Sequence, residues 1–174
     1  MAGRRQDVLA SAVRTFAARG YRATSMDAVA QEARISRPGL YFLFSSKPAL
    51  FREAVAHLLT EDLAAVEDVL SERGRPLGDR LVDAFDRWAG RWVGPPAADV
   101  PRVIADNPDL LDPSARDAPA RFEALVTRAV AEQVAEPAPV VATLLSVSVG
   151  LKHQATTREE YSERFRTAVT LLLR

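Results

Sequence analysis

The sequence predicts an all-α protein in which a small helical head is followed by a larger helical body. Three observations support this prediction. Apolar residues recur every three to four positions through most of the 174 residues, which is the spacing of one helix face. Serine or threonine residues in N-cap patterns precede several of these stretches. No stretch alternates apolar and polar residues for long enough to form a sheet.

Two helices are predicted before residue 34. Apolar residues between Leu9 and Phe16 follow the i, i+3, i+4, i+7 pattern. Gly20 is expected to end this helix, because glycine takes a left-handed conformation without steric cost. Thr24 and Asp27 then form a Ser/Thr-x-x-Asp/Glu capping box, which predicts the start of the second helix.

The third and fourth helices each begin with a serine and an early proline. Ser36 is predicted to cap a short third helix, with Pro38 in its first turn, where a missing N–H costs no hydrogen bond. Ser46 and Pro48 repeat this pattern before a fourth helix that runs towards Gly74. We place the boundary within the fourth helix, which gives a head over residues 1–50 and a body over residues 51–174.

Helical periodicity continues through the body, with prolines between the helices. Apolar and aromatic residues from Leu77 to Trp92 repeat every three to four positions. The stretch Val140 to Leu151 is apolar nearly all round, which predicts a helix buried on several sides. The other predicted segments are a short piece around 103–105, a helix over about 117–135, and a last helix opened by the capping pattern of Thr157 and Glu160.

Composition excludes several classes of protein. The chain has no cysteine, which removes disulfides and thiolate metal sites and fits a reducing cytoplasm. It has neither a signal-peptide pattern nor an uninterrupted apolar run of about 18 residues, so we expect a cytoplasmic protein without a membrane partner. It has two histidines and no Gly-x-Ser-x-Gly, phosphate-loop or His-Glu-x-x-His motif. We therefore expect no enzyme activity, catalytic residue, metal site or cofactor.

The head and the body differ in charge, although the net charge of the chain is zero. Residues 1–50 hold eight basic and three acidic side chains, a net charge of +5, and the remainder holds 15 basic and 20 acidic ones, a net charge of −5. A basic head suits a nucleic-acid partner, because phosphate neutralisation supplies much of the affinity for DNA. An ordinary charge fluctuation explains the same difference equally well.

The second and third predicted helices, with the tight turn 34–36 between them, have the proportions of a helix-turn-helix over about residues 25–44. The second helix of this motif lies in the major groove of DNA. Leu40, Leu43 and Phe44 are expected to face the small core of the head. The residues left to face DNA are Arg37, Pro38, Gly39, Tyr41 and Phe42.

The side chains of this surface suit contacts with DNA. Arg37 can donate two hydrogen bonds to guanine or one to a phosphate, and Phe42 can touch a thymine methyl group. Tyr41 offers a phenol to a phosphate, and Gly39 lets the helix approach closely, although glycine lowers helix stability by about 0.5–1 kcal/mol. Lys47 stands near the positive end of a helix dipole, which indicates an external anion such as phosphate. The alternative for Leu40, Tyr41 and Phe42 is ordinary packing in a core, and the alternative for Lys47 is a solvated position on the surface.

The motif residues resemble the TetR family of repressors over about residues 8–55. The resemblance implies nine helices, a three-helix DNA-binding head, a linking fourth helix and a homodimer formed by the last two helices. It also implies a ligand-responsive repressor that binds a palindromic double-stranded DNA operator and therefore lies at the nucleoid. The matching segments are Thr24-Ser25-Met26-Asp27-Ala28-Val29-Ala30, Ala33-Arg34-Ile35-Ser36, Gly39-Leu40-Tyr41-Phe42-Leu43-Phe44 and Ser46-Lys47-Pro48-Ala49-Leu50.

The resemblance implies a role for each matching residue. Base-facing positions are Arg37, Pro38, Gly39 and Phe42. Phosphate contacts are Ser25, Tyr41 and Lys47, and we place Thr24 on the same surface. The sequence departs from the family at three places: Arg34 replaces a glycine, Pro38-Gly39 replaces Gly-Thr, and Leu43 replaces a histidine or tyrosine. If the turn requires a positive φ, Arg34 costs roughly 1 kcal/mol.

A ligand pocket and a dimer surface are expected in the body. The resemblance implies a cavity for an unknown small-molecule effector between the fifth and eighth helices, and pockets are mostly apolar with a few polar groups. The candidate lining residues are His57, Phe85, Trp88, Trp92 and Phe122. Ordinary packing, or a surface position for His57, is the alternative.

The two apolar C-terminal helices predict a dimer seam, with a monomeric core as the alternative. A two-fold dimer would place two recognition helices at DNA half-sites about 34 Å apart or at a multiple of that spacing. The candidate interface residues are Val141, Leu144, Leu145, Val149, Phe165, Val169 and Leu172.

Two other functions compete with DNA binding. An all-α enzyme would show substrate turnover, but the sequence contains no reacting group of residues that predicts it. A protein-interaction module derived from the same fold would have lost DNA binding, and Arg34, Pro38 and Gly39 keep this reading open. Salt-dependent binding to DNA would discriminate against the interaction module.

Overall fold

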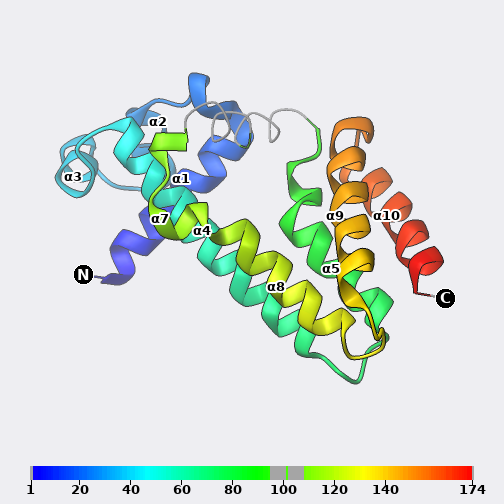
Figure 1. Ribbon diagram of the computed structural model, residues 1–174. Helices are drawn as coiled ribbons and strands as arrows, with labels where there is room; N and C mark the ends of the chain where they lie inside the picture. Colours follow the sequence, from blue (N-terminus) through cyan, green and yellow to red (C-terminus); the bar gives the residue numbers. More distant parts are fainter. Residues whose placement is uncertain (1, 95–100, 102–107, 174) are drawn as a thin grey trace. The chain divides into compact units, whose positions relative to one another are not determined.

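The computed structural model describes residues 2–94, 101 and 108–173, and all regular elements within these ranges are helical. This confirms the predicted all-α class. The α-helices are α1 (Ala2–Ala23), α2 (Met26–Glu32), α3 (Arg37–Leu43), α4 (Lys47–Ser71), α5 (Leu77–Trp88), α7 (Pro113–Arg116), α8 (Ala118–Val130), α9 (Pro137–Gln154) and α10 (Arg158–Leu172) (Figure 1). Two 3-10 turns, η1 (Gly90–Trp92) and η2 (Pro108–Leu110), lie between them.

The chain divides into two compact units. Unit 1 is Met1–Glu61 with Pro95–Asp117, and unit 2 is Asp62–Gly94 with Ala118–Arg174. The division between Glu61 and Asp62 falls within α4, the helix in which the sequence also placed its boundary. The domain limit at residue 50 itself stays a prediction.

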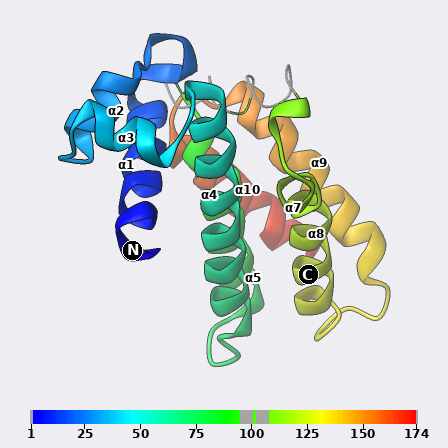
Figure 2. The same cartoon turned by 90° about the vertical axis from the view of Figure 1, so that its left-hand side faces the viewer.

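In unit 1, α1, α2 and α3 gather together, as Figure 2 shows. The rings of Phe16 and Phe51 meet edge to face with their centroids 5.0 Å apart, and Tyr21 lies 4.7 Å from Phe51. Gly20 has φ 74°, as its predicted role required, but the chain continues as helix to Ala23 after the kink. The kink brings Tyr21 onto the aromatic cluster, so the glycine shapes the core and does not end the element.

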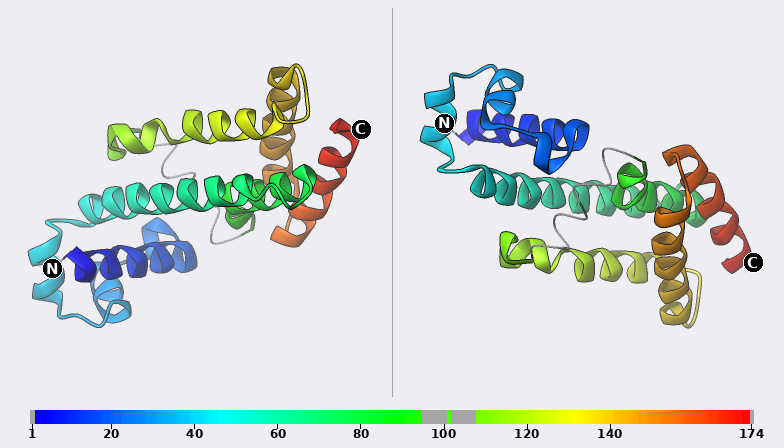
Figure 3. Two further views of the ribbon diagram at one scale, coloured as in Figure 1. Left: turned by 90° about the horizontal axis from the view of Figure 1, so that it is seen from below. Right: turned by 90° about the horizontal axis from the view of Figure 1, so that it is seen from above.

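In unit 2, α10 packs against both α5 and α9, and α9 packs against α8. Figure 3 shows α9 (orange) and α10 (red) side by side. Phe85 of α5 is fully buried and contacts Phe122 of α8 and Phe165 of α10, at centroid distances of 5.0 Å and 4.4 Å. Edge-to-face and tilted ring pairs stabilise a core beyond the area that they bury. This aromatic cluster therefore fixes three helices of unit 2.

Several predicted boundaries are corrected by the structure. The helix predicted through Trp92 ends at Trp88 and continues as η1, and the helix predicted over 117–135 is Ala118–Val130 with the separate α7 before it. The predicted piece at 103–105 lies outside the described residues. Ser36, Ser46 and Thr157 cap their helices as predicted, accepting hydrogen bonds of 3.1–3.2 Å from backbone N–H groups.

Two arginine clusters join helices within unit 2. Asp62 of α4 is 1% exposed and accepts hydrogen bonds from Arg87 at 2.9 Å and from Arg91 at 2.6 Å. Arg80, 2% exposed, donates to the backbone carbonyl of Leu70 near the end of α4 and to Glu132 at 2.9 Å. Buried charges require such partners, because burial without them is costly. No helix in the described ranges is long and apolar enough to cross a bilayer.

Candidate nucleic-acid interface

The structure forms the predicted helix-turn-helix in unit 1 from α2, a turn over residues 33–36, and α3. The hydroxyl of Ser25 caps α2 by accepting a hydrogen bond of 3.1 Å from the N–H of Ala28. The hydroxyl of Ser36 caps α3 by accepting one of 3.1 Å from the N–H of Gly39. Each cap satisfies a backbone donor that the helix itself leaves without a partner. The two caps therefore fix where both helices begin.

Thr24 does not take the role that the sequence predicted. Its side chain is 2% exposed, and its hydroxyl donates a hydrogen bond of 2.8 Å to the carbonyl of Gly20. The N-cap is the next residue, Ser25, which is exposed. The prediction of a Thr24 cap and of a Thr24 contact with DNA is therefore wrong, because this threonine closes the kink at the end of α1.

The turn between α2 and α3 contains a strained residue. Arg34 has φ 54° and is the non-glycine residue with a positive φ among the described residues. Its N–H donates to the carbonyl of Gln31 at 3.1 Å, and the next N–H, that of Ile35, donates to Ala30 at 3.0 Å. These bonds satisfy the end of α2 and require the left-handed conformation. The conditional prediction of a positive φ at this position is thus confirmed, and the strain is about 1 kcal/mol.

The inner face of α3 anchors the helix. Leu40 is fully buried and Phe44 is 2% exposed, as predicted, whereas Leu43 is only half-buried. Arg5 of α1 donates a hydrogen bond of 2.9 Å to the carbonyl of Leu43, pairs with Glu53 of α4, and stacks 4.4 Å above the ring of Phe44. Arg5 was not predicted as a site residue. Its partners lie about 40–50 positions away along the chain, so no local pattern could have revealed it.

The outer face of α3 presents the predicted contact residues to solvent. Phe42 is 87% exposed and Tyr41 is 43% exposed, which makes them two of the four exposed large apolar residues in the described chain. Arg37 and Pro38 are also exposed. An arginine beside exposed aromatic rings on one helix face can offer hydrogen bonds to base edges and phosphates and apolar contact to a thymine methyl.

Arg37 lies between two other side chains. Its Nε is 3.2 Å from Oδ1 of Asp27 on α2, and its guanidinium lies 5.8 Å from the ring centroid of Tyr41, one turn further along α3. The sequence offered Asp27 only as part of a capping box with Thr24. The structure shows that its carboxylate instead faces Arg37, the first residue of α3.

The surroundings of Gly39 place a local constraint on this position, in addition to the predicted close approach to DNA. A Cβ at this position would lie 3.1 Å from Oγ of Ser36, the atom that caps α3. A side chain here would therefore press on the cap of the helix. This contact identifies a local constraint that accompanies the lower intrinsic helix stability of glycine.

Lys47 is tied to the end of α1 and does not extend freely into solvent. Its ammonium donates a hydrogen bond of 3.3 Å to the carbonyl of Arg22 and lies 4.4 Å from the ring centroid of Tyr21. Burial lowers the pKa of this lysine. The position holds a cation at the first residue of α4, as the predicted phosphate contact requires, but the same contacts also join α1 to α4.

The predicted pocket residues fall into both units. Phe85, Trp88 and Phe122 come together in unit 2, where the Trp88 and Phe122 rings stack with centroids 4.7 Å apart. Trp92 is 9% exposed in η1. His57 belongs to unit 1, and its Nε2 lies 3.5 Å from a carboxylate oxygen of Glu61. Phe85, Trp88 and Phe122 are packed on one another, which matches the alternative of ordinary core packing.

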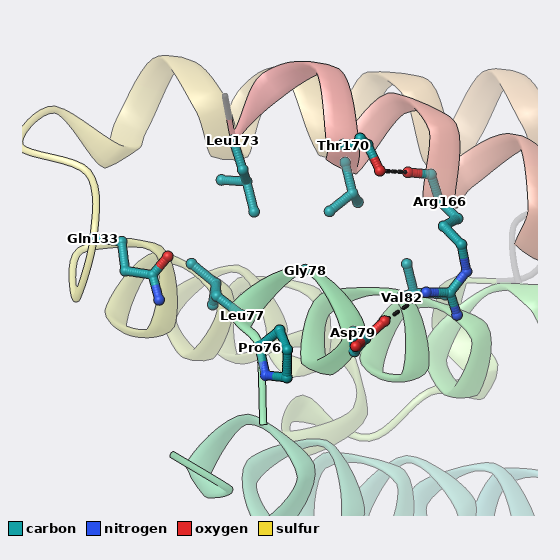
Figure 4. Close-up of a pocket in the computed structure, with 10 residues that line it drawn as sticks. Pro76, Leu77, Gly78, Asp79, Val82, Gln133, Arg166, Thr170 and Leu173 are labelled. Carbon is teal, nitrogen blue, oxygen red and sulfur yellow. Dashed lines mark hydrogen bonds and ion pairs between the residues drawn. The ribbon is translucent and has the colours of Figure 1, made fainter. Parts of the chain in front are cut away.

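A cavity of about 380 Å³ lies elsewhere in unit 2, between the start of α5 and the end of α10 (Figure 4). Its lining includes the buried Leu77 and Val169, and the ion pair of Arg166 with Asp79, 2.6 Å long, stands at its edge. Gln133 lines it from the segment after α8. None of the five predicted pocket residues lines this cavity.

The predicted dimer residues differ in their exposure. Four of them, on both helices, are at most 2% exposed within the protomer and cannot form an interface surface: Val141, Leu144, Phe165 and Val169. This part of the prediction is wrong, because these side chains form the contacts of α9 and α10 within their own unit. Val149 is 59% exposed, and Leu145 and Leu172 are half-buried, so these three stay candidates.

Comparison with known proteins gives one match in sequence and many in fold. Residues 8–54 match the family of bacterial regulatory proteins described as the tetR family. No curated protein matches the chain significantly. The matched residues contain the whole helix-turn-helix described above.

Solved structures share the fold over nearly the whole chain. A putative TetR-family transcriptional regulator from Mesorhizobium loti is 20% identical, with a TM-score of 0.72 over 99% of this chain and 96% of that chain. A TetR-family transcriptional regulator from Streptomyces coelicolor is 23% identical, with a TM-score of 0.71 over 99% and 95%. The regulator FadR from Bacillus subtilis, solved in complex with stearoyl-CoA, is 11% identical, with a TM-score of 0.63 over 96% of both chains. Residues 8–54 thus match the tetR family, and over nearly its whole length the chain shares the fold of these solved transcriptional regulators.

Proposed function

We propose that the protein is a repressor that binds a palindromic DNA operator as a homodimer and leaves it when a small molecule binds its C-terminal part. The observation that supports this most is the outer face of α3, where Arg37 and the exposed rings of Tyr41 and Phe42 stand together. These groups suit base edges and phosphates, and α3 is the recognition helix of the matched family. The proposal places the protein in the cytoplasm, where bacterial DNA lies.

A dimer is supported by the exposed apolar residues of the last two helices. Val149 on α9 and Leu171 on α10 are 59% and 58% exposed, which makes them the other two exposed large apolar residues of the described chain. A two-fold dimer would let two copies of α3 reach half-sites about 34 Å apart or a multiple of that distance.

A small-molecule effector is supported by the shared fold, since Bacillus subtilis FadR was solved with stearoyl-CoA. A ligand shifts the equilibrium between two forms of a repressor only by its difference in affinity for them. We therefore propose that the effector binds the form with low DNA affinity more tightly. The residues of unit 2 would supply its site.

The first test is fluorescence anisotropy with the DNA that flanks the gene of the protein and with a random duplex, at several salt concentrations. Tight binding to the flanking DNA by two protomers, with a steep salt dependence, is the expected result. Equal and weak binding to both duplexes would contradict an operator beside the gene, and a genome-wide selection of bound fragments would then locate it. Absence of binding at low salt would overturn the proposal.

Two variants separate base reading from phosphate contact. Arg37→Ala is expected to cost about 1–3 kcal/mol of operator affinity and to relax specificity, because Arg37 faces bases in the proposal. Lys47→Ala is expected to weaken binding to all sequences alike. Equal losses on operator and random DNA for Arg37→Ala would contradict its base-reading role.

A protein-interaction module is the second candidate. The 87% exposure of Phe42 favours it, since an exposed aromatic ring beside an arginine also suits a protein partner. Salt-dependent DNA binding would discriminate against this candidate, as would loss of that binding in Arg37→Ala.

A further inference from the structure

Asp27 stands out on the proposed DNA-binding surface because its charge opposes binding to phosphates. It lies in the first turn of α2, about half exposed, and its Oδ1 is 3.2 Å from Nε of Arg37. A surface ion pair of this kind contributes little to stability. A carboxylate near DNA also repels the backbone, so fold stability alone gives a weak reason for this residue.

The geometry limits which edge of the Arg37 guanidinium is free. The Nε side faces Asp27, and the guanidinium also lies 5.8 Å from the ring centroid of Tyr41. Asp27 on α2 and Tyr41 on the next turn of α3 therefore flank the planar group on two sides. The edge formed by Nη1 and Nη2 is left to donate two parallel hydrogen bonds, and guanine offers the two acceptors O6 and N7 in the major groove.

We propose that Asp27 is a positioning residue, which orients Arg37 to read a guanine and so increases the ratio of operator to random binding. The proposal rests on the proposed DNA-binding function. Holding the guanidinium in place before binding reduces the side-chain entropy lost on contact with the base. The negative charge of Asp27 lowers the affinity for the phosphates of operator and random DNA alike, so it is the orientation of Arg37 that increases the ratio of operator to random binding.

The test compares Asp27→Asn with a matched control, Glu32→Gln. Glu32 also lies on α2 and forms an exposed ion pair, with Arg14 at 3.4 Å, but that pair does not involve α3. Both variants remove one negative charge from the same helix. Anisotropy is measured for each on the operator, on a random duplex, and on operators in which each base pair is replaced in turn.

We expect Asp27→Asn to lower the ratio of operator to random affinity by about tenfold, because operator binding loses the oriented Arg37 whereas the removed charge affects both duplexes alike. The lost discrimination should fall at the base pair whose recognition Arg37→Ala also relaxes. In the Arg37→Ala background, Asp27→Asn should change this discrimination no further, because no guanidinium remains to be positioned. Glu32→Gln should leave the ratio unchanged.

Three results would overturn the inference. Asp27→Asn could change operator and random binding by the same factor, as Glu32→Gln would, which would leave only a charge effect. Its loss of discrimination could add to that of Arg37→Ala, which would show that it acts through another group. A wild-type protein that binds no DNA would overturn the proposed function and this inference together, whereas an unchanged ratio in a DNA-binding protein overturns the inference alone.

Discussion

The hydroxyl groups of Tyr161 on α10 and Ser148 on α9 lie 2.7 Å apart in a hydrogen bond inside unit 2. Tyr161 is fully buried and Ser148 is 5% exposed, so water cannot replace either partner. The bond joins the two helices that we propose as the dimer surface. Their packing within the protomer therefore depends on a polar contact as well as on apolar area.

Tyr161→Phe should lower the free energy of unfolding by about 1–2 kcal/mol, because it leaves the buried Ser148 hydroxyl without a partner. Urea denaturation followed by circular dichroism measures this change. The double variant Tyr161→Phe with Ser148→Ala should cost less than the sum of the two single changes. Strict additivity in this cycle would contradict a coupled bond.

The same tyrosine predicts a loss of stability at alkaline pH. Burial raises the pKa of Tyr161 to about 12, although the bond from Ser148 acts in the opposite direction. The unfolded tyrosine loses its proton near pH 10 and the folded one near pH 12, so this contribution to stability is intact below pH 10 and declines between these values. Over this whole pH range, the free energy of unfolding should fall by about 2–3 kcal/mol.

Urea denaturation at pH values from 8 to about 12 tests this prediction in wild type and Tyr161→Phe. The comparison is necessary because burial also raises the pKa of Tyr21, which adds a decline in the same direction. The variant should show the shallower decline. Parallel stability curves for the two proteins would exclude Tyr161 as a source of the pH dependence.

Arg91→Ala should destabilise the protein more than Asp62→Asn, although both changes break the same ion pair. Burial raises the pKa of Asp62 even against the opposing effects of Arg91 and Arg87, so ionisation of this carboxyl group is disfavoured in the folded protein. Asparagine removes the buried charge and leaves arginines that are 27% and 45% exposed and can turn to water. Alanine at position 91 instead leaves the carboxylate with one partner.

The expected costs are about 2–3 kcal/mol for Arg91→Ala and less than about 1 kcal/mol for Asp62→Asn, measured by urea denaturation at pH 7. A larger cost for the asparagine variant would show that the ionised carboxylate contributes net stability. Circular dichroism of both variants checks that the helical content is unchanged.

Arg34→Gly should raise the free energy of unfolding by about 0.5–1 kcal/mol, because glycine adopts φ 54° without strain. The greater conformational freedom of glycine in the unfolded chain offsets part of this gain. We also expect weaker binding to all DNA and a salt slope reduced by about 1, because Arg34 is exposed and its charge suits a phosphate. Arg34→Lys retains both strain and charge and serves as the control. A glycine variant with unchanged DNA affinity would contradict the phosphate contact.

Local signals made the helix starts predictable. Ser36, Ser46 and Thr157 act within one turn of chain, so their capping roles follow from neighbouring residues. The cap of α2 was misassigned because Thr24 and Ser25 are adjacent and both suit an N-cap. The choice between them depends on the kink at Gly20, whose carbonyl accepts the Thr24 hydroxyl.

Contacts between distant residues could not be predicted in this way. Nothing in the sequence pairs Arg37 with Asp27 or Arg5 with Glu53, because the orientation of two helices decides which side chains meet. The same limit explains the dimer prediction. Apolar periodicity identified α9 and α10, but it could not separate Val141 and Phe165, which face their own core, from Val149, which faces solvent.

Val149→Glu should therefore shift the proposed dimer to monomers. Position 149 is 59% exposed within the protomer, so the glutamate costs little in the monomer, whereas two-fold symmetry would bury two like charges in the interface. We expect the dimer dissociation constant, measured by sedimentation velocity, to rise by about 100-fold, since an unpaired buried charge costs several kcal/mol.

Ala124→Glu, which adds the same charge at an exposed position on α8, should leave the constant unchanged. Operator affinity should fall in Val149→Glu, because each monomer binds only one half-site at a time. It should stay unchanged in Ala124→Glu. A Val149→Glu protein that dimerises as tightly as wild type would exclude this face of α9 from the interface.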